Sequence, residues 1–174
     1  MAEERTRERD LVLGPNEYSY VRDETKGNVN IYCGSYKASL SQTDQPVILN
    51  KEGKFVPALN LDVAKQQFVI VKQNNYVVLE NPEINGLFPK TGTVSNSSEL
   101  KVGKKVNIAG PTTFPLWPGQ IATVIEGHKL KSNQFLVVRV YSEEEAKENW
   151  NKSIISSEND SNVFDVKNLR IGKL

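Results

Sequence analysis

Short runs of hydrophobic and polar residues alternate along most of the chain and are separated by turn residues, a pattern typical of β-strands. The runs at residues 18–21 and 28–32 are joined by a polar loop that ends in Gly27, a residue able to adopt positive φ, so we expect an antiparallel hairpin there. Further strands are expected at residues 11–13, 45–50, 55–59, 67–71, 76–80, 121–125 and 134–141. The pattern therefore predicts an all-β fold that is mainly antiparallel.

One pattern occurs twice: a hydrophobic strand, a polar turn, and a Val-Asn-Ile strand that leads to a glycine. Matching positions are Leu11 and Phe68 at the start, Val29 and Val106 in the later strand, and Gly34 and Gly110 at its end. The first pair is 68 − 11 = 57 residues apart and the second pair is 106 − 29 = 77 residues apart, so about twenty residues are inserted in the second copy. We therefore predict two tandem small β-modules, residues 11–66 and residues 67–141, the second with an inserted loop at residues 82–105.

The two ends of the chain differ from these modules. Residues 1–10 alternate acids and bases without hydrophobic periodicity, which is typical of a charged N-terminal arm. Ser142 is a suitable helix N-cap, and the acids that follow it suit a first helical turn, so a short helix is expected at residues 142–150. The rest of the 142–174 segment is polar and is expected to be an extended tail.

Composition and charge narrow the choice of partners. The chain has 174 residues, of which 38% are hydrophobic and 25% charged, as in soluble globular proteins. Lysine and arginine total 22 against 21 acids, so there is no overall field to attract phosphates, and nucleic acid is not an expected partner. No apolar run approaches the roughly 18 to 20 residues that span a bilayer, so no membrane span is expected. The charged start and the single cysteine, Cys33, indicate a cytoplasmic protein.

Catalytic and metal-binding groups are scarce in the sequence. His128 is the only histidine and Cys33 the only cysteine, so the chain lacks the parts for a Cys-His pair or a zinc site. The run Gly103-Lys104-Lys105 lacks the preceding glycine of a phosphate-binding loop. We therefore expect a protein that is not an enzyme and that needs no cofactor or metal.

Aromatic residues are the best candidates for a contact surface. Trp117 lies between Pro115 and Pro118, and we expect it to be a rigid, exposed anchor of the kind enriched at interface hot spots. The other candidates are tyrosines on the expected strands, namely Tyr18, Tyr20, Tyr36 and Tyr76. Such tyrosines either pack between modules, which we favour, or form a platform on which sugars or bases stack.

These segments resemble the repeat domains of the major vault protein family. Residues 13–23 resemble the family's first strand and turn, residues 29–36 resemble its return strand, and residues 45–49 resemble the strand that follows. The segment Phe114-Pro115-Leu116-Trp117-Pro118-Gly119-Gln120 is similar to the family's Pro-Leu-Tyr-Pro-Gly-Glu segment. The resemblance covers residues 11–141, with Cys33-Gly34-Ser35 standing where the family has Val-Gly-Pro. It implies a subunit of a large self-assembly.

The leading functional hypothesis is a non-enzymatic structural subunit that self-associates or docks on larger subunits, in a vault-like particle or a virion. Its partners would be copies of itself or other structural subunits. The alternative is a carbohydrate-binding or other ligand-binding β-module that uses exposed tyrosines and the loop at residues 82–105.

Overall fold

The computed structural model describes residues 9–127 and 131–134 of the chain. Its elements are β1 (Asp10–Leu13), β2 (Glu17–Asp23), β3 (Val29–Cys33), β4 (Tyr36–Ser39), β5 (Asp44–Leu49), β6 (Phe55–Pro57), α2 (Leu61–Ala64), β7 (Lys65–Gln67), β8 (Val69–Val71), β9 (Asn75–Glu80), β10 (Val94–Asn96), β11 (Lys105–Ala109), β12 (Thr112–Phe114) and β13 (Ile121–Glu126). All strand pairs among them are antiparallel, which confirms the all-β prediction. The helix expected at residues 142–150 and the strand expected at 134–141 lie outside the described residues.

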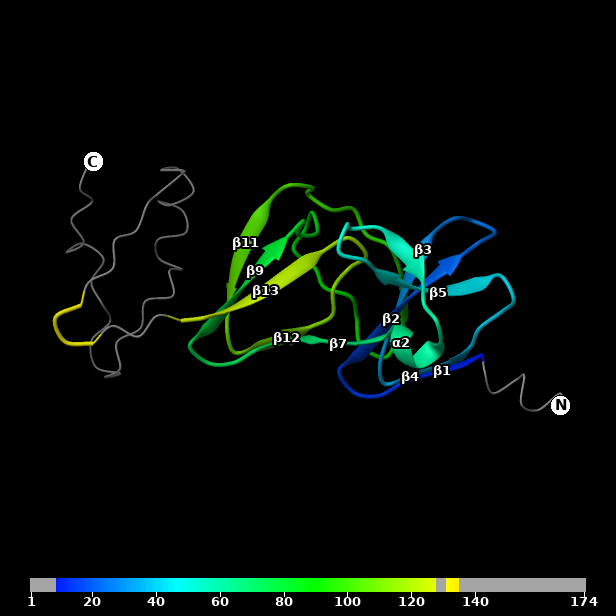
Figure 1. The fold of residues 1–174 in the computed structure, drawn as a ribbon, viewed down its shortest axis with the longest axis horizontal. Helices are drawn as coiled ribbons and strands as arrows, with labels where there is room; N and C mark the ends of the chain where they lie inside the picture. Colours follow the sequence, from blue (N-terminus) through cyan, green and yellow to red (C-terminus); the bar gives the residue numbers. More distant parts are fainter. Residues whose placement is uncertain (1–8, 128–130, 135–174) are drawn as a thin grey trace. The chain divides into compact units, whose positions relative to one another are not determined.

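Residues 9–127 form one compact unit that holds four sheets. The largest sheet has the order β10-β3-β2-β5-β6, with β7 also pairing with β2, and a second sheet has the order β11-β9-β13. Two-stranded ribbons, β1-β4 and β12-β8, accompany them (Figure 1). The hairpin expected at the start of the chain is present as β2 and β3, and the boundary expected at residue 66 falls within this unit.

The same set of strand pairs occurs twice in this unit. In the first repeat, residues 10–67, β1 pairs with β4 and β2 pairs with both β3 and β5. In the second repeat, residues 68–127, β8 pairs with β12 and β9 pairs with both β11 and β13. The duplication inferred from the sequence is therefore a duplication of topology.

The registers of the two repeats can be superimposed residue by residue. The opening turns place Asn16 opposite Asn74, an offset of 74 − 16 = 58 before the hairpin loop, and the glycines that donate to those turns place Gly34 opposite Gly110, an offset of 110 − 34 = 76 after it. With these offsets the pair of Leu11 and Ala38 corresponds to the pair of Val69 and Phe114. The same offsets relate the β2-β3 pairs to the β9-β11 pairs and the β2-β5 pairs to the β9-β13 pairs. The offsets of 57 and 77 expected from the sequence are each wrong by one residue.

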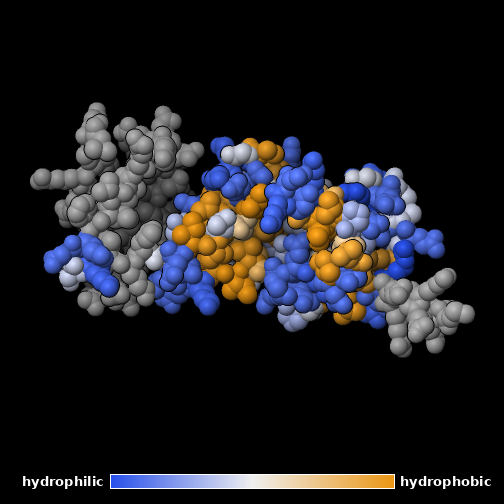
Figure 2. Space-filling view, in the orientation of Figure 1, coloured by the Kyte–Doolittle hydropathy of each residue, from blue (hydrophilic) through white to orange (hydrophobic). Residues whose placement is uncertain are grey.

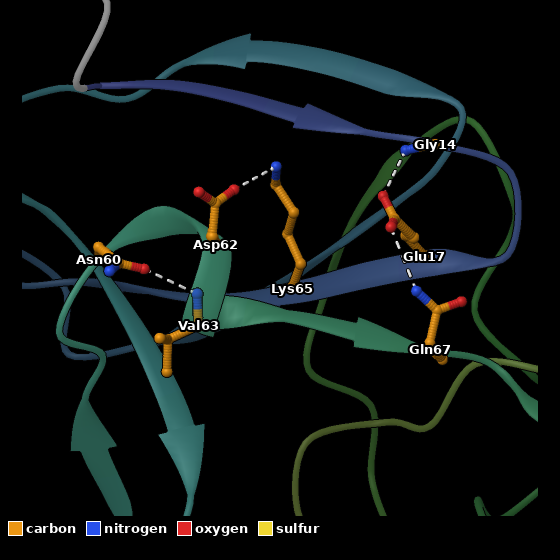
Figure 3. A network of polar contacts seen from close by, with 7 residues as sticks. All are labelled: Gly14, Glu17, Asn60, Asp62, Val63, Lys65 and Gln67. Atoms are coloured by element: carbon orange, nitrogen blue, oxygen red, sulfur yellow. Dashed lines mark hydrogen bonds and ion pairs between the residues drawn. The ribbon is translucent and has the colours of Figure 1, made fainter.

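Each repeat carries one insertion. In the second repeat, residues 81–104 replace the short loop between the hairpin strands, and they contain β10, which pairs with β3 of the first repeat. In the first repeat, β5 and β7 share the side of β2 that β13 alone covers in the second. The intervening segment holds β6 and α2, and Asn60 caps that helix by accepting a hydrogen bond from the Val63 amide at 2.8 Å (Figure 3).

Three hydrophobic clusters fill the interior. The first lies on one face of the large sheet, around Tyr20 and Ile31, and includes Phe68 and Trp117 of the second repeat. The second lies on the opposite face of β2, around Val21, under the β1-β4 ribbon. The third is the counterpart of the second and lies between β9 and the β8-β12 ribbon; its buried residues are Val71, Val77, Leu79 and Phe114.

The turn that opens each repeat has the same geometry, with an asparagine in the left-handed region. Asn16 has φ 61° and Asn74 has φ 65°, a conformation that asparagine adopts more readily than most residues. In the first turn the Glu17 carboxylate accepts a hydrogen bond from the Gly14 amide at 2.7 Å (Figure 3).

A third copy of this turn occurs at residues 131–134. Asn133 has φ 69°, and the Gln134 amide donates to the Lys131 carbonyl oxygen at 3.1 Å. The Lys131 amide donates to the Gln134 side chain at 3.0 Å, as Gly14 does to Glu17. The opening turn of the repeat is therefore present three times in the chain.

Candidate interaction surface

Two of the candidate tyrosines, Tyr18 and Tyr20, lie inside the molecule rather than on its surface. They are 3% and 2% exposed, and their rings meet edge to face with centroids 5.3 Å apart. The Tyr20 hydroxyl donates to the Leu116 carbonyl oxygen at 2.8 Å and also lies 3.3 Å from that of Trp117. These tyrosines join the first repeat to the second and are not available to a ligand.

Trp117 is also an internal anchor. The expectation that it is exposed is wrong, because only 8% of the residue is accessible. Its indole N–H donates to the Leu87 carbonyl oxygen at 2.7 Å, and its backbone amide donates to the Gln120 side chain at 2.9 Å. The indole packs in the same buried cluster as Tyr20 and Ile31 of the first repeat.

The remaining two candidates, Tyr36 and Tyr76, lie on different sheets. Tyr36 lies on β4, half-buried, with its ring centroid 6.1 Å from that of Tyr32. Tyr76 lies half-buried on β9, opposite Ala109 on one neighbouring strand and Ile125 on the other. The structure therefore brings together Tyr18, Tyr20 and Trp117 but leaves Tyr36 and Tyr76 apart from them.

Tyr76 belongs to an apolar surface that the sequence analysis did not find. Directly opposed residues of antiparallel strands point to the same side of a sheet. On the β11-β9-β13 sheet, the side facing away from the third core cluster carries Tyr76, Val78, Ala109, Ile121 and Ile125, which we call the outer face. Figure 2 shows hydrophobic surface over the region of these strands.

All five residues of the outer face are half-buried or exposed, and Ile121 is 45% exposed. Among residues 9–127 and 131–134, none of them belongs to a core cluster or an aromatic pair. Lys105 and Glu80 form an ion pair of 2.6 Å at one end of this side of the sheet. The sequence contained a signal of this surface, because the expected strand at residues 121–125 is apolar on both sides. Ile121 and Ile125 lie on one side of it, and Ala122 and Val124 lie on the other.

The edge of β11 is the second exposed feature of this sheet. In the first repeat, β10 extends the sheet at the edge of β3, and the Cys33 amide donates to the Thr93 carbonyl oxygen at 3.0 Å. Ala109 is the counterpart of Cys33, at the offset of 109 − 33 = 76. Within the described part of the chain, β11 pairs only with β9.

Several titratable groups of the described residues are buried or hydrogen-bonded, and their pKa values are shifted. Burial raises the pKa of the Cys33 thiol and that of the Tyr18 hydroxyl to about 12 each, and it also raises the pKa of Tyr20. The hydrogen bonds that the Glu83 carboxylate accepts lower its pKa, and the bond from the Leu87 amide has the largest effect. Desolvation of the carboxylate acts in the opposite direction. No three His, Cys, Asp or Glu residues of the described segments gather as metal ligands would.

Glu83 organises the inserted loop of the second repeat. Its carboxylate accepts hydrogen bonds from the Asn85 amide at 2.7 Å, the Leu87 amide at 2.8 Å and the Ser98 hydroxyl at 3.2 Å. These contacts hold the Leu87 carbonyl where it meets the Trp117 indole. The loop at residues 81–104 is thus tied to the turn that carries Trp117, and its strand β10 pairs with β3 of the first repeat.

Two comparisons with known proteins found no relative of this chain. A scan against protein-family models gave no match, and a search of curated proteins gave none either. Among the helices that the structure describes, none has the length and apolar character that crossing a membrane requires.

Proposed function

We propose that this protein is a non-enzymatic structural subunit that takes part in a larger protein assembly by packing β-modules against one another. The observation that carries the proposal is the contact between the two repeats. Phe68, Leu116 and Trp117 of the second repeat cover one face of the first, while β10 extends its sheet. One chain thus already uses its modules as building blocks, and the same packing between chains would build an assembly.

The state of the reactive groups supports the non-enzymatic part of the proposal. Cys33 and Tyr20 are buried with raised pKa values, so neither is poised as a nucleophile or a general base. Asp10 and Asp23 have lowered pKa values because Ser39 and Thr25, respectively, donate hydrogen bonds to them. Each of these groups stabilises a local element.

The ligand-binding alternative has less support from the described residues. Tyr18, Tyr20 and Trp117 are at most 8% exposed, so three of the five candidate aromatics cannot stack on a sugar. Tyr36 and Tyr76 are half-buried and belong to different sheets.

The assembly role can be tested on the purified full-length chain and in extracts of its source. Light scattering after size-exclusion chromatography, over a wide concentration range, should give a mass above that of one chain, or capture from native extract should recover a partner in stoichiometric amount. A chain that stays monomeric at high concentration and recovers no stoichiometric partner would contradict the proposal.

A further inference from the structure

The inserted loop of the second repeat contains the one Asn-Gly pair in the sequence, Asn85-Gly86. Both residues are exposed, and Gly86 has φ +73° with no atom within 4 Å of the place where a Cβ would lie. An asparagine that precedes a glycine is chemically labile, because no side chain shields the glycine backbone nitrogen from the neighbouring amide carbon. The pair is therefore a candidate for covalent change in the folded chain.

The reaction open to this pair is deamidation. The Gly86 backbone nitrogen bonds to Cγ of Asn85 and loses its proton, while the Cγ–Nδ2 bond breaks and Nδ2 takes up that proton and leaves as ammonia. Water then opens the resulting cyclic imide at either of its carbonyl carbons, which gives aspartate or isoaspartate at position 85. Water is the only co-reactant, and no electron is transferred.

The hydrogen bonds around Glu83 hold the pair in a turn that restrains this reaction. The Gly86 amide donates to the Glu83 carbonyl oxygen at 3.0 Å, so its nitrogen is engaged. The Glu83 side chain, in a residue that is only 6% exposed, accepts from the Asn85 amide at 2.7 Å and from the Asn85 side-chain nitrogen at 3.3 Å. Attack on Cγ therefore requires the turn to open, and the bonds to the Glu83 carboxylate set how often it opens.

The same carboxylate connects the turn to Trp117. It accepts from the Leu87 amide at 2.8 Å, and the Leu87 carbonyl oxygen accepts from the Trp117 indole N–H at 2.7 Å. Deamidation replaces the Asn85 side-chain donor with a second carboxylate beside that of Glu83, and two like charges this close repel each other. An isoaspartate also lengthens the backbone between Glu83 and Leu87. Either product therefore disturbs the contact that holds the Trp117 indole.

We propose that Asn85 is a site of spontaneous deamidation that Glu83 restrains, and that the reaction loosens the inserted loop from Trp117. The site is a slow, irreversible clock within the folded chain. It operates in a single chain, so it does not depend on the proposed function, and either proposal can fail without the other.

Peptide mapping by mass spectrometry, after incubation of the purified full-length chain at mildly alkaline pH, measures the reaction. Aspartate and isoaspartate should accumulate at Asn85, and more slowly in the folded chain than in the urea-unfolded chain. Asn96 is the internal control, because it is also exposed and precedes a small residue, Ser97, but lies in β10. It should stay unmodified in the folded chain over the same period.

Two variants separate the restraint by Glu83 from overall stability. Glu83→Ala removes the acceptor that holds the turn and should raise the rate at Asn85 in the folded chain at least about fivefold. Gly53→Ala is the matched control, because it strains the distant turn between β5 and β6 and should leave that rate unchanged. Circular dichroism establishes that both variants are folded. If Glu83→Ala is not folded, Glu83→Gln takes its place and is judged by the same results.

The aspartate product can be made directly by substitution. In Asn85→Asp, hydrogen exchange of the Trp117 indole N–H should be at least about threefold faster than in Asn85→Ala, which removes the same amide without adding a charge. Nuclear magnetic resonance follows this proton in the folded chain.

Each of the following results would overturn the proposal. Asn85 of the folded wild-type chain stays intact while that of the unfolded chain reacts to completion, or it reacts equally fast in both. The rate in folded Glu83→Ala is unchanged, or Gly53→Ala raises it as much. The Trp117 indole exchanges equally fast in Asn85→Asp and Asn85→Ala.

Discussion

The hydroxyl of Tyr20 on β2 lies 2.8 Å from the carbonyl oxygen of Leu116, 96 residues further along the chain. This hydrogen bond joins the first repeat to the turn that carries Trp117, in a part of the core where Tyr20 is 2% exposed. In such buried surroundings the Leu116 carbonyl oxygen has few other hydrogen-bond donors within reach. The bond therefore contributes to the docking of the two repeats as well as to the local structure.

Replacing Tyr20 with phenylalanine should test this link. Y20F keeps the ring but removes the donor, so we expect the free energy of unfolding to fall by about 1–2 kcal/mol. Urea unfolding followed by circular dichroism measures the change. Y36F is the matched control, because Tyr36 is half-buried and its hydroxyl bonds to no residue of the described segments; its effect should stay below about 0.5 kcal/mol. Equal losses in the two variants would contradict the role of the hydroxyl.

The glycines that end β3 and β11 should be among the least replaceable residues. A Cβ on Gly34 would lie 1.9 Å from the Gly14 carbonyl oxygen, and a Cβ on Gly110 would lie 2.1 Å from that of Lys72. Both contacts are with backbone, which cannot move aside cheaply, so G34A and G110A should each cost about 2–4 kcal/mol in unfolding experiments.

A glycine in open space provides the control for these substitutions. Gly53 has φ +78°, and a Cβ at this position would meet no atom within 4 Å, so G53A should cost only about 1 kcal/mol, from backbone strain alone. If G34A were as mild as G53A, the close approach of the two backbone segments would not exist in solution.

The sequence predicted the strands better than their register. The repeated Val-Asn-Ile motif suggested that Val29 matches Val106, but the opening turns and the glycines that follow the strands, Gly34 and Gly110, match Val29 with Lys105. A shift of one residue moves every side chain to the other face of a sheet. Register here follows the close approaches of Gly34 and Gly110 to the opening turns, which composition and alternation do not reveal.

The sequence also identified Trp117 as an anchor but not where it docks. Flanking prolines indicate a rigid turn, whereas the side that the indole faces depends on contacts with Leu87 and with the first repeat. The outer face was missed for the same reason. Tyr76 and Tyr18 have similar sequence surroundings, but only the neighbours supplied by tertiary structure decide that one is half-buried and the other buried.

Glu83 should make stability depend on pH. Its hydrogen bonds lower the pKa of the carboxyl in the folded chain, whereas in the unfolded chain the pKa is near the ordinary value of about 4.3. The stabilisation is therefore complete above that ordinary value and is lost as the pH falls toward the lower folded pKa. Urea unfolding should show E83Q less stable than the wild type at pH 7, with a smaller difference at about pH 3. A difference that does not shrink at low pH would contradict the role of the ionised carboxylate.

Cys33, the only cysteine in the chain, should report on the opening of the first repeat. It is 0% exposed, and burial raises the pKa of its thiol to about 12, so almost no thiolate exists near pH 8 and a reagent cannot reach the sulfur. A disulfide reagent at that pH should label the native chain very slowly and the urea-unfolded chain rapidly. Because Tyr20 packs in the same cluster, Y20F should speed native labelling by about the factor that its loss of stability implies, roughly 5- to 30-fold for 1–2 kcal/mol. Fast labelling of the native wild-type chain would show that Cys33 is not in the buried cluster, and an unchanged rate in Y20F would show that the repeats open independently of the Tyr20 contact.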